Sequence, residues 1–321
     1  MSLPSDADKA GPADGGDVSA IGRPVLRDGV STQHPGRAGD SGIDALKPVW
    51  TILLHLGLLL LALVFLIPFF WLICAAFKQP EDIFGYAFLP WRDLHRLTLD
   101  NFRSLFHDQP YGRWLINSLF VACAQTVLVV TFSSMGGFAL AKYEFRGKRI
   151  VMLLMLATML LPGVVLLAGS VELMIRIGWM NSYSALIFPG AASVFGTFLF
   201  RQAMLGVPDE LLAAGRIDGC SELRLWWEVA LPVVRPMVAA FTFLSFLAAW
   251  NSYLWPVTVL QDQSKFTLPM GLASMMGVQE SQSQYGILMA GTLVGIVPVA
   301  ILFFAMQRDF IAGLASGAVK G

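Results

Sequence analysis

The feature that most constrains this chain is a set of six apolar runs that contain no Asp, Glu, Lys or Arg. A helix that crosses a bilayer needs about 20 residues, and the backbone of a span in lipid must hydrogen-bond within the protein. Because each run is long enough for a helix and too long for a barrel strand, we predict six transmembrane helices. Pro189, Gly190 and Gly196 interrupt the fourth run. The runs cover residues 49–77, 114–141, 150–170, 181–200, 236–260 and 285–306.

Composition supports an all-α polytopic membrane protein. Hydrophobic residues make up 56% of the chain and charged residues 14%, whereas soluble domains average about 45–50% and about 25%. Residues 1–47 are rich in Gly, Asp, Ser, Pro and Ala, and are expected to be a disordered cytoplasmic tail ahead of a transmembrane domain over 48–321. The net charge is zero, so no global field favours nucleic acid. The three cysteines lack metal-ligand spacing, and no metal site is expected.

Basic residues between the runs predict the orientation. With the N-terminus inside, 15 of the 22 Lys and Arg residues fall on the cytoplasmic side, four of them in the short connection 142–149. The positive-inside rule therefore favours cytoplasmic N- and C-termini. Small residues cluster at 133–137 and 291–295, where they permit close helix contact; we favour helix packing over a pore as their role.

The connection 201–236, between the fourth and fifth runs, predicts a helix, a glycine turn and a second helix. Pro208 suits the start of the first helix, and Gly219 can end it in the left-handed conformation. Ser221 is a candidate N-cap for a second helix that runs to about Val229. Such a segment could dock in a groove of a partner protein or lie on the lipid surface, and physical reasoning leaves both readings open.

The same segment reads Asp209-Glu-Leu-Leu-Ala-Ala-Gly-Arg-Ile-Asp-Gly219, followed by Leu231-Pro232, and it resembles the EAA loop of binding-protein-dependent ABC importer permeases. The similarity extends to other stretches and is strongest to maltose-type and glycerol-phosphate-type permease subunits. The supporting stretches are Asn117-Ser118, Gly137-Phe-Ala-Leu-Ala-Lys-Tyr143, Trp250-Asn251 and Gly317-Ala-Val-Lys-Gly321.

The loop departs from the family pattern at two positions. Ala213 stands where the family has glutamate, and Gly215 stands where it has the second alanine. Glu210 lies one helical turn earlier and could replace the charge but not its position. The resemblance implies an ATPase-coupling loop whose residues are Glu210, Ala213, Ala214, Gly215, Arg216, Asp218, Gly219, Leu231 and Pro232.

By the same resemblance, this chain is a permease subunit of a sugar importer in a bacterial inner membrane. It would pair with a second, homologous permease subunit, two cytoplasmic ATP-binding subunits and an extracytoplasmic solute-binding protein. No catalytic residue is expected in this chain, since it lacks a Gly-rich loop ending in Gly-Lys-Ser or Gly-Lys-Thr. ATP and Mg²⁺ would be used by the partner subunits, and this chain would bind no cofactor.

A polar and aromatic group within the fifth run is a possible solute pathway: Trp250, Asn251, Ser252 and Tyr253. Polar residues in spans usually face the bundle interior. A hydrogen bond from Asn251 to another helix is the alternative.

Two other functions fit the sequence less well. An ion-coupled secondary transporter usually carries ionisable groups within its spans, and the six runs lack Asp, Glu, Lys and Arg. An intramembrane enzyme would need a nucleophile turn such as Gly-x-Ser-x-Gly or a metal motif such as His-Glu-x-x-His, and the sequence has neither.

Overall fold

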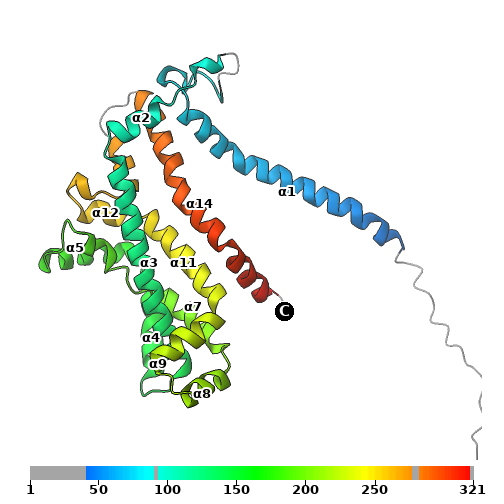
Figure 1. Ribbon diagram of the computed structural model, residues 1–321, viewed down its shortest axis with the longest axis vertical. Helices are drawn as coiled ribbons and strands as arrows, with labels where there is room; N and C mark the ends of the chain where they lie inside the picture. The colour runs from blue at the N-terminus through cyan, green and yellow to red at the C-terminus, as the bar shows by residue number, and fades with distance from the viewer. Residues whose placement is uncertain (1–40, 90–92, 277–281, 319–321) are drawn as a thin grey trace, which may run out of the picture. The chain divides into compact units, whose positions relative to one another are not determined.

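The computed structural model describes residues 41–89, 93–276 and 282–318, which form helices and turns without a strand among them (Figure 1). The chain divides into two units, Met1–Leu61 and Ala62–Gly321. Helix α1 (Ser41–Ala76) begins in the first unit and ends in the second. The packing described below is that of the second unit.

The expected N-terminal tail falls mostly outside the described residues. Nothing is described for residues 1–40, whereas residues 41–47 belong to α1. The helix thus begins before the predicted boundary between tail and membrane domain.

Three helices are long and apolar enough to cross a membrane without a break. They are Trp50–Ala76 of α1, all of α3 (Tyr111–Lys142), and Gln284–Arg308 of α14 (Gln282–Ala318). Two bent pairs could each form one further span: Lys148–Met159 with Gly163–Arg176, bent by 94°, and Glu222–Val233 with Arg235–Trp250, bent by 90°. The described helices therefore supply three to five candidate spans, and six spans remain a prediction.

The bend in the third expected span lies at a proline. Helix α4 (Lys148–Met159) ends before Pro162, and the chain continues through η3 (Gly163–Leu166) into α5 (Leu167–Arg176). Proline lacks the N–H that an α-helix needs and restricts the residue before it to extended backbone. The apolar run 150–170 is therefore two helices with a bend between them, and its crossing of the membrane as one span remains a prediction.

The fourth and fifth expected spans are also interrupted. The fourth consists of α6 (Tyr183–Ile187) and α7 (Val194–Leu205), which are separated by the segment that contains Pro189 and Gly190. The fifth begins as α11 (Arg235–Trp250), loses helical structure at residues 251–253, and resumes as the short α12 (Leu254–Val259).

The remaining elements are short. Those between α1 and α3 are η1 (Pro80–Asp82), η2 (Leu94–Arg96) and α2 (Asp100–His107). Between α7 and α11 lie α8 (Asp209–Ile217), α9 (Glu222–Arg224), the π-helical turn η4 (Leu225–Ala230) and α10 (Leu231–Val233). Between α12 and α14 lie η5 (Gln263–Lys265) and α13 (Leu268–Met275).

Helix α3 is the central element of the second unit, and its most extensive contact is with α7. The two helices meet at Gly137, where a Cβ would lie 2.5 Å from Phe200 Cβ and 2.7 Å from the backbone nitrogen of Arg201. Ser133, which is fully buried, donates a hydrogen bond of 3.3 Å to the carbonyl of Ser193. Residues 133–137 thus pack helices together, as expected for small side chains.

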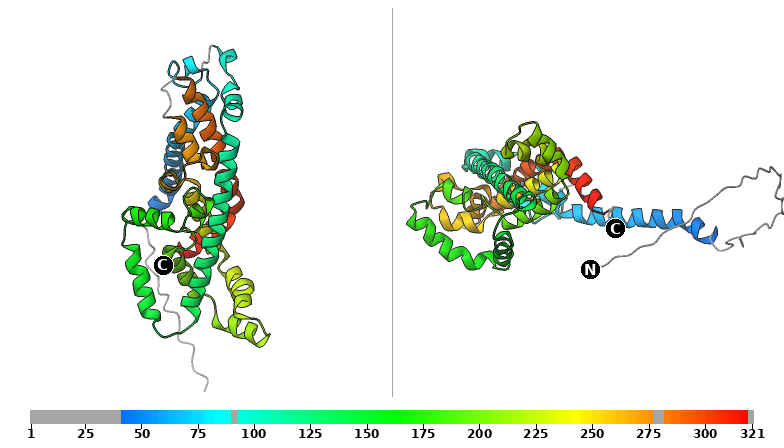
Figure 2. Two further views of the ribbon diagram at one scale, coloured as in Figure 1. Left: turned by 90° about the vertical axis from the view of Figure 1, so that its left-hand side faces the viewer. Right: turned by 90° about the horizontal axis from the view of Figure 1, so that it is seen from below.

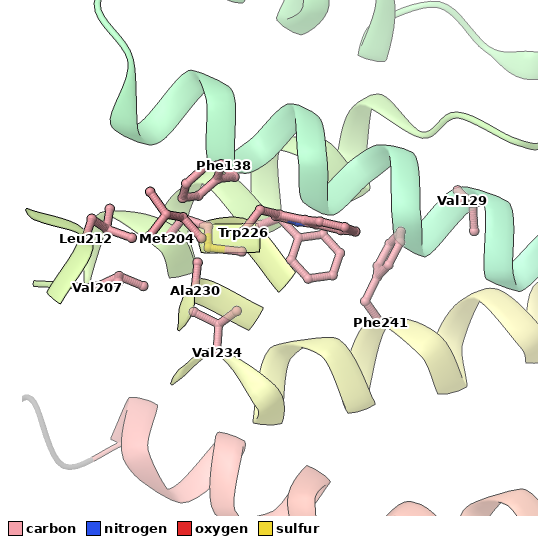
Figure 3. Close-up of a cluster of buried hydrophobic side chains, with 11 residues drawn as sticks. Val129, Phe138, Met204, Val207, Leu212, Trp226, Ala230, Val234 and Phe241 are labelled. Atoms are coloured by element: carbon pink, nitrogen blue, oxygen red, sulfur yellow. The ribbon is translucent and has the colours of Figure 1, made fainter. Parts of the chain in front are cut away.

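Three apolar clusters fill the second unit. One lies at the end that carries α8, and Figure 3 shows Phe138, Met204 and Trp226 gathered there. A second surrounds Trp114 near the start of α3, and a third surrounds Leu186 of α6. The turn between α3 and α4 lies at the same end as α8, which we call the loop end (Figures 1 and 2).

The opposite end is held by polar side chains of α3 that bind backbone from distant segments. Asn117 Nδ2 donates to the carbonyls of Ser264 (3.0 Å) and Phe266 (2.9 Å), and Asn117 Oδ1 accepts from the Tyr183 hydroxyl (2.8 Å). Ser118 Oγ accepts from the backbone N–H of Leu268 at 2.6 Å. The Asn117-Ser118 pair therefore fixes the segment between α12 and α13 over the start of α3.

We expect Gly137→Val to destabilise the protein strongly. Its side chain would meet backbone atoms of α7, which cannot move aside as a side-chain tip can, and overpacking typically costs about 1–3 kcal/mol. Thermal unfolding in detergent should show a midpoint several degrees lower. Gly169→Val is the control, because a Cβ at Gly169 of α5 would have nothing within 4 Å. Equal midpoints for the two variants would contradict close packing at Gly137.

Candidate functional site

The segment between α7 and α11, which we call the loop, contains α8 as its first helix. Helix α8 has one buried side and one exposed side. Pro208 stands at its N-cap, and Asp209 and Glu210 lie in its first turn, where the helix dipole favours negative charge. Leu212 is 1% exposed and enters the apolar cluster of Figure 3. Ala213 and Ala214 are exposed, and the Ile217 side chain is 86% exposed. The exposed side of α8 therefore includes small and apolar residues, Ala213, Ala214 and Ile217, next to the charged Arg216.

Gly219 ends α8 in the left-handed conformation, with φ of +80°. The backbone N–H of Gly219 donates to the Arg216 carbonyl at 3.1 Å, and that of Cys220 donates to the Gly215 carbonyl at 2.9 Å. This pair of bonds is the Schellman pattern, which satisfies carbonyls at the end of a helix. The turn is thus closed by backbone bonds, and the exposed Asp218 side chain takes no part in them.

The second helix begins at Ser221, whose hydroxyl accepts a 3.4 Å hydrogen bond from the N–H of Arg224. It continues past Val229, through η4 to Val233, and so is longer than predicted. Pro232 has no N–H to direct at the carbonyl of Glu228, as a regular α-helix would require. The π-helical turn directly before Leu231-Pro232 is consistent with that missing donor.

Gly215 lets the two helices of the loop come together. A Cβ at Gly215 would overlap the Cδ2 methyl of Leu225, whose side chain is fully buried. Gly215 therefore faces the second helix rather than the exterior, and the glycine in place of the family's alanine is matched to the leucine beside it.

Two residues at the end of α3 bind the loop. Lys142 Nζ donates to the carbonyl of Val207 (2.6 Å) and to Asp209 Oδ1 (2.7 Å). The Tyr143 hydroxyl donates to Glu222, which also receives both a 2.9 Å and a 3.1 Å hydrogen bond from Arg216. The bonds from Lys142 and Tyr143 join segments that lie far apart in the sequence.

The charges in this network hold Glu222 ionised. Hydrogen bonds from Arg216 and then from Tyr143 keep the pKa of the Glu222 carboxyl below its usual range. Burial, followed by the bond to Glu222, raises the pKa of Tyr143, so the phenol remains a donor at neutral pH. A lowered carboxyl pKa means that the network is present above the ordinary value of about 4.3 and is lost as the pH falls through the lower folded-state value.

A cavity of about 670 Å³ lies midway along α3. Gln125 of α3 and Gly190 face each other there, and a Cβ at Gly190 would overlap the Gln125 amide. Thr267 also lines the cavity, but its hydroxyl is buried and has no hydrogen-bond partner within the described residues. Ligand pockets typically measure about 300–1,000 Å³ and carry a few polar groups. The remaining polar lining residues are Ser170, Ser193, Ser245 and Ser252.

Only one of the four predicted solute-pathway residues lines this cavity. Ser252 does so, whereas Trp250 is 5% exposed and stacks on Phe246 at a centroid distance of 5.6 Å. Asn251 Nδ2 donates to the Leu247 carbonyl of its own helix at 2.9 Å, and not to another helix as in the alternative considered from the sequence. Tyr253 is 45% exposed and does not line the cavity.

Comparison with known proteins identifies the class. A family model described as binding-protein-dependent transport system inner membrane component matches residues 133–312, more than half of the chain. The chain therefore belongs to this family of membrane transport components.

Its relatives are similar over nearly their whole length. The chain is 39% identical to the arabinooligosaccharides transport system permease protein AraQ of Halalkalibacterium halodurans, covering 86% of this chain and 98% of the relative. It is 31% identical to the sn-glycerol-3-phosphate transport system permease protein UgpE of Yersinia pestis, covering 82% and 95%. A crystal structure of a bacterial ABC transporter for alginate import has the same fold, with a TM-score of 0.73, 22% identity, and coverage of 82% and 97%.

The sequence did not predict the roles of Lys142, Tyr143 and Gln125. Gln125 could have been found as a polar amide within a long apolar run. Lys142 belongs to the basic connection and, with Tyr143, to the stretch Gly137–Tyr143 of the family resemblance, but nothing local indicates that its ammonium binds residues 65 and 67 positions away.

We expect Gly219→Val to abolish transport while the protein stays in the membrane, and Gly219→Asn to keep much of it. A left-handed conformation costs a non-glycine residue about 1–2 kcal/mol, and asparagine tolerates it far better than a β-branched residue. Substrate uptake and membrane content should be measured together. Normal uptake by Gly219→Val would show that the turn is not needed for function.

Proposed function

We propose that this chain is a transmembrane subunit of an ATP-driven importer that moves a sugar or sugar-like solute into the cytoplasm. Membership of the binding-protein-dependent family carries this proposal. The relatives AraQ and UgpE are named for arabinooligosaccharides and sn-glycerol-3-phosphate, which are both polyhydroxylated. We accordingly place a second permease subunit, an ATP-binding subunit pair and an extracytoplasmic solute-binding protein in the assembly.

We propose six spans with both termini in the cytoplasm. Lys142 contacts Asp209, which brings the two predicted cytoplasmic connections to one end of the second unit. At the opposite end, the Asn181 N–H donates to the Val259 carbonyl, and Trp114 Nε1 donates to the Gln263 carbonyl. This grouping of connections supports helices that alternate in direction.

We propose that α8 docks on the ATP-binding subunit. Its exposed side presents Ala213, Ala214 and Ile217, whereas Leu212 anchors the helix in the protein core. Small side chains allow a partner groove to approach the backbone closely. Gly215 is turned towards Leu225, so it supports the loop instead of contacting the partner.

Uptake into liposomes tests the function. The assembly, isolated from native membranes through a tag on this chain, is reconstituted with the solute-binding protein and given labelled arabinooligosaccharide or sn-glycerol 3-phosphate. We expect accumulation with ATP on the side of the ATP-binding subunits and none with ADP. Uptake driven by an ion gradient without nucleotide would instead support a secondary transporter.

We propose that the cavity beside Gln125 is the solute pathway in this subunit. The amide of Gln125 can hydrogen-bond a polyhydroxylated solute, and Ser252 adds a second polar group to the lining. The lining also includes Trp255, whose ring can cover an apolar sugar face.

We expect Gln125→Ala to lower uptake by about three- to tenfold, because one hydrogen bond contributes about 0.5–1.5 kcal/mol. Asn251→Ala is the matched control, since Asn251 bonds to its own helix and does not line the cavity. Initial uptake rates over a range of solute concentrations would measure both. A larger loss in Asn251→Ala than in Gln125→Ala would return the pathway to residues 250–253.

A further inference from the structure

Besides the apolar cluster around Leu212, two kinds of connection join the loop to the rest of the second unit. The loop continues by covalent chain into α7 and α11, and it is bound by side chains to α3, which is distant in sequence. The bonds to α3 span 65, 67 and 79 residues. A displacement of α8 could therefore reach the rest of the protein through its neighbours in the chain or through α3.

The first bond to α3 is made by a buried cation. The Lys142 side chain is 6% exposed, and its ammonium binds both the Val207 carbonyl and the Asp209 carboxylate. Val207 lies directly before the start of α8, and Asp209 lies in its first turn. Lys142 thus binds the segment where the chain enters α8.

The second bond to α3 is made by Tyr143, the C-cap residue of α3. Its ring packs edge-on against Phe138 of the same helix, at a centroid distance of 5.7 Å and an angle of 88°. This contact directs the hydroxyl to Glu222, which opens the second helix and also binds Arg216 of α8. Glu222 consequently ties α3 to both helices of the loop.

These bonds constrain direction as well as proximity. The apolar cluster around Leu212 and Trp226 holds the loop against the protein, but apolar contact is non-directional and permits sliding. Hydrogen bonds to charged groups are shorter and stronger than neutral ones, and a bidentate Arg–carboxylate pair adds geometric specificity. Glu222, held from two sides, fixes the orientation of the loop on α3.

Helix α3 reaches from these bonds to the proposed solute cavity and beyond. It contains 32 residues without a proline, which corresponds to about 48 Å at about 1.5 Å per residue. Val121, Gln125 and Val129 line the cavity on the way, and Asn117 binds the segment between α12 and α13 at the far end. A movement of its loop end would therefore move the cavity wall directly.

We propose that α3 transmits motion from the loop to the solute cavity, and that Lys142 and Tyr143 are positioning residues that make α3 and the loop move as one body. This inference rests on the proposed coupling of the loop to an ATP-binding subunit. It assigns a role to two residues outside the coupling motif, and it names the helix that carries the motion.

The test compares three single variants in the purified assembly with its solute-binding protein. Tyr143→Phe keeps the ring contact with Phe138 and removes the hydroxyl, and Glu222→Gln removes the charge that it binds. Glu228→Gln is the matched control, because Glu228 forms an ion pair with Arg224 in the same loop at 2.8 Å and does not reach α3. Solute uptake, ATP hydrolysis, thermal unfolding and subunit content are measured for each.

We expect Tyr143→Phe and Glu222→Gln each to lower the solute moved per ATP hydrolysed by about five- to tenfold, with unchanged assembly and unfolding midpoint. A hydrogen bond to a charged group is stronger than a neutral one, and the partial exposure of Glu222 reduces its contribution. The double variant should resemble Glu222→Gln, because that change already weakens the bond from Tyr143 as well as the pair with Arg216. Glu228→Gln should match the unsubstituted protein.

Two results would overturn the inference. One is an unchanged ratio of uptake to hydrolysis in both Tyr143→Phe and Glu222→Gln. The other is a fall in uptake that simply follows a loss of assembly or stability, which would leave a structural role only. If the unsubstituted assembly itself shows no ATP-driven uptake, the proposed function fails first, so the two failures are distinguishable.

Discussion

The close approach of α3 and α7 at Gly137 is the contact on which the rest of the second unit depends. In lipid, apolar side chains gain little by leaving the solvent for another helix, so association relies on tight packing between small residues. Gly137 allows α7 backbone to lie against α3. Because α7 leads directly into Val207 and Pro208, its position on α3 sets where α8 begins. Gly196 of α7 in turn accepts the ring of Phe241, which brings α11 to the same place.

Local features of the loop were predictable from the sequence. Proline at a helix start, glycine at a helix end and serine at an N-cap act through the backbone of their immediate neighbours, so Pro208, Gly219 and Ser221 could be placed without knowledge of the fold. The length of the second helix was less predictable, because the π-helical turn before Leu231 depends on Pro232 and on burial of Leu225 and Trp226. Apolar runs likewise predicted the long helices α1, α3 and α14 but gave no measure of the bend near Pro162.

Long-range contacts were not predictable in this way. Nothing near Tyr143 indicates a bond to Glu222, which is 79 residues away. The cavity also combines α3, the segment before α7, α11 and the start of α13, so its lining appears only when these elements are folded together. The polar group at residues 250–253 suggests a solute pathway because it is contiguous in sequence, yet the end of α11 turns its members in different directions: Trp250 inward, Ser252 to the cavity, and Asn251 to its own helix.

The pairing of Gly215 with Leu225 makes these two positions dependent on each other. The α8 backbone at Gly215 is covered by a fully buried leucine that fills the space of a missing methyl group. A permease that carries alanine at the first position must shorten or reorient the side chain at the second to keep the same distance between the two loop helices. The pair is therefore expected to vary jointly among related permeases, so transplanting a family-typical Glu-Ala-Ala triplet into this loop would require a compensating change ten residues downstream.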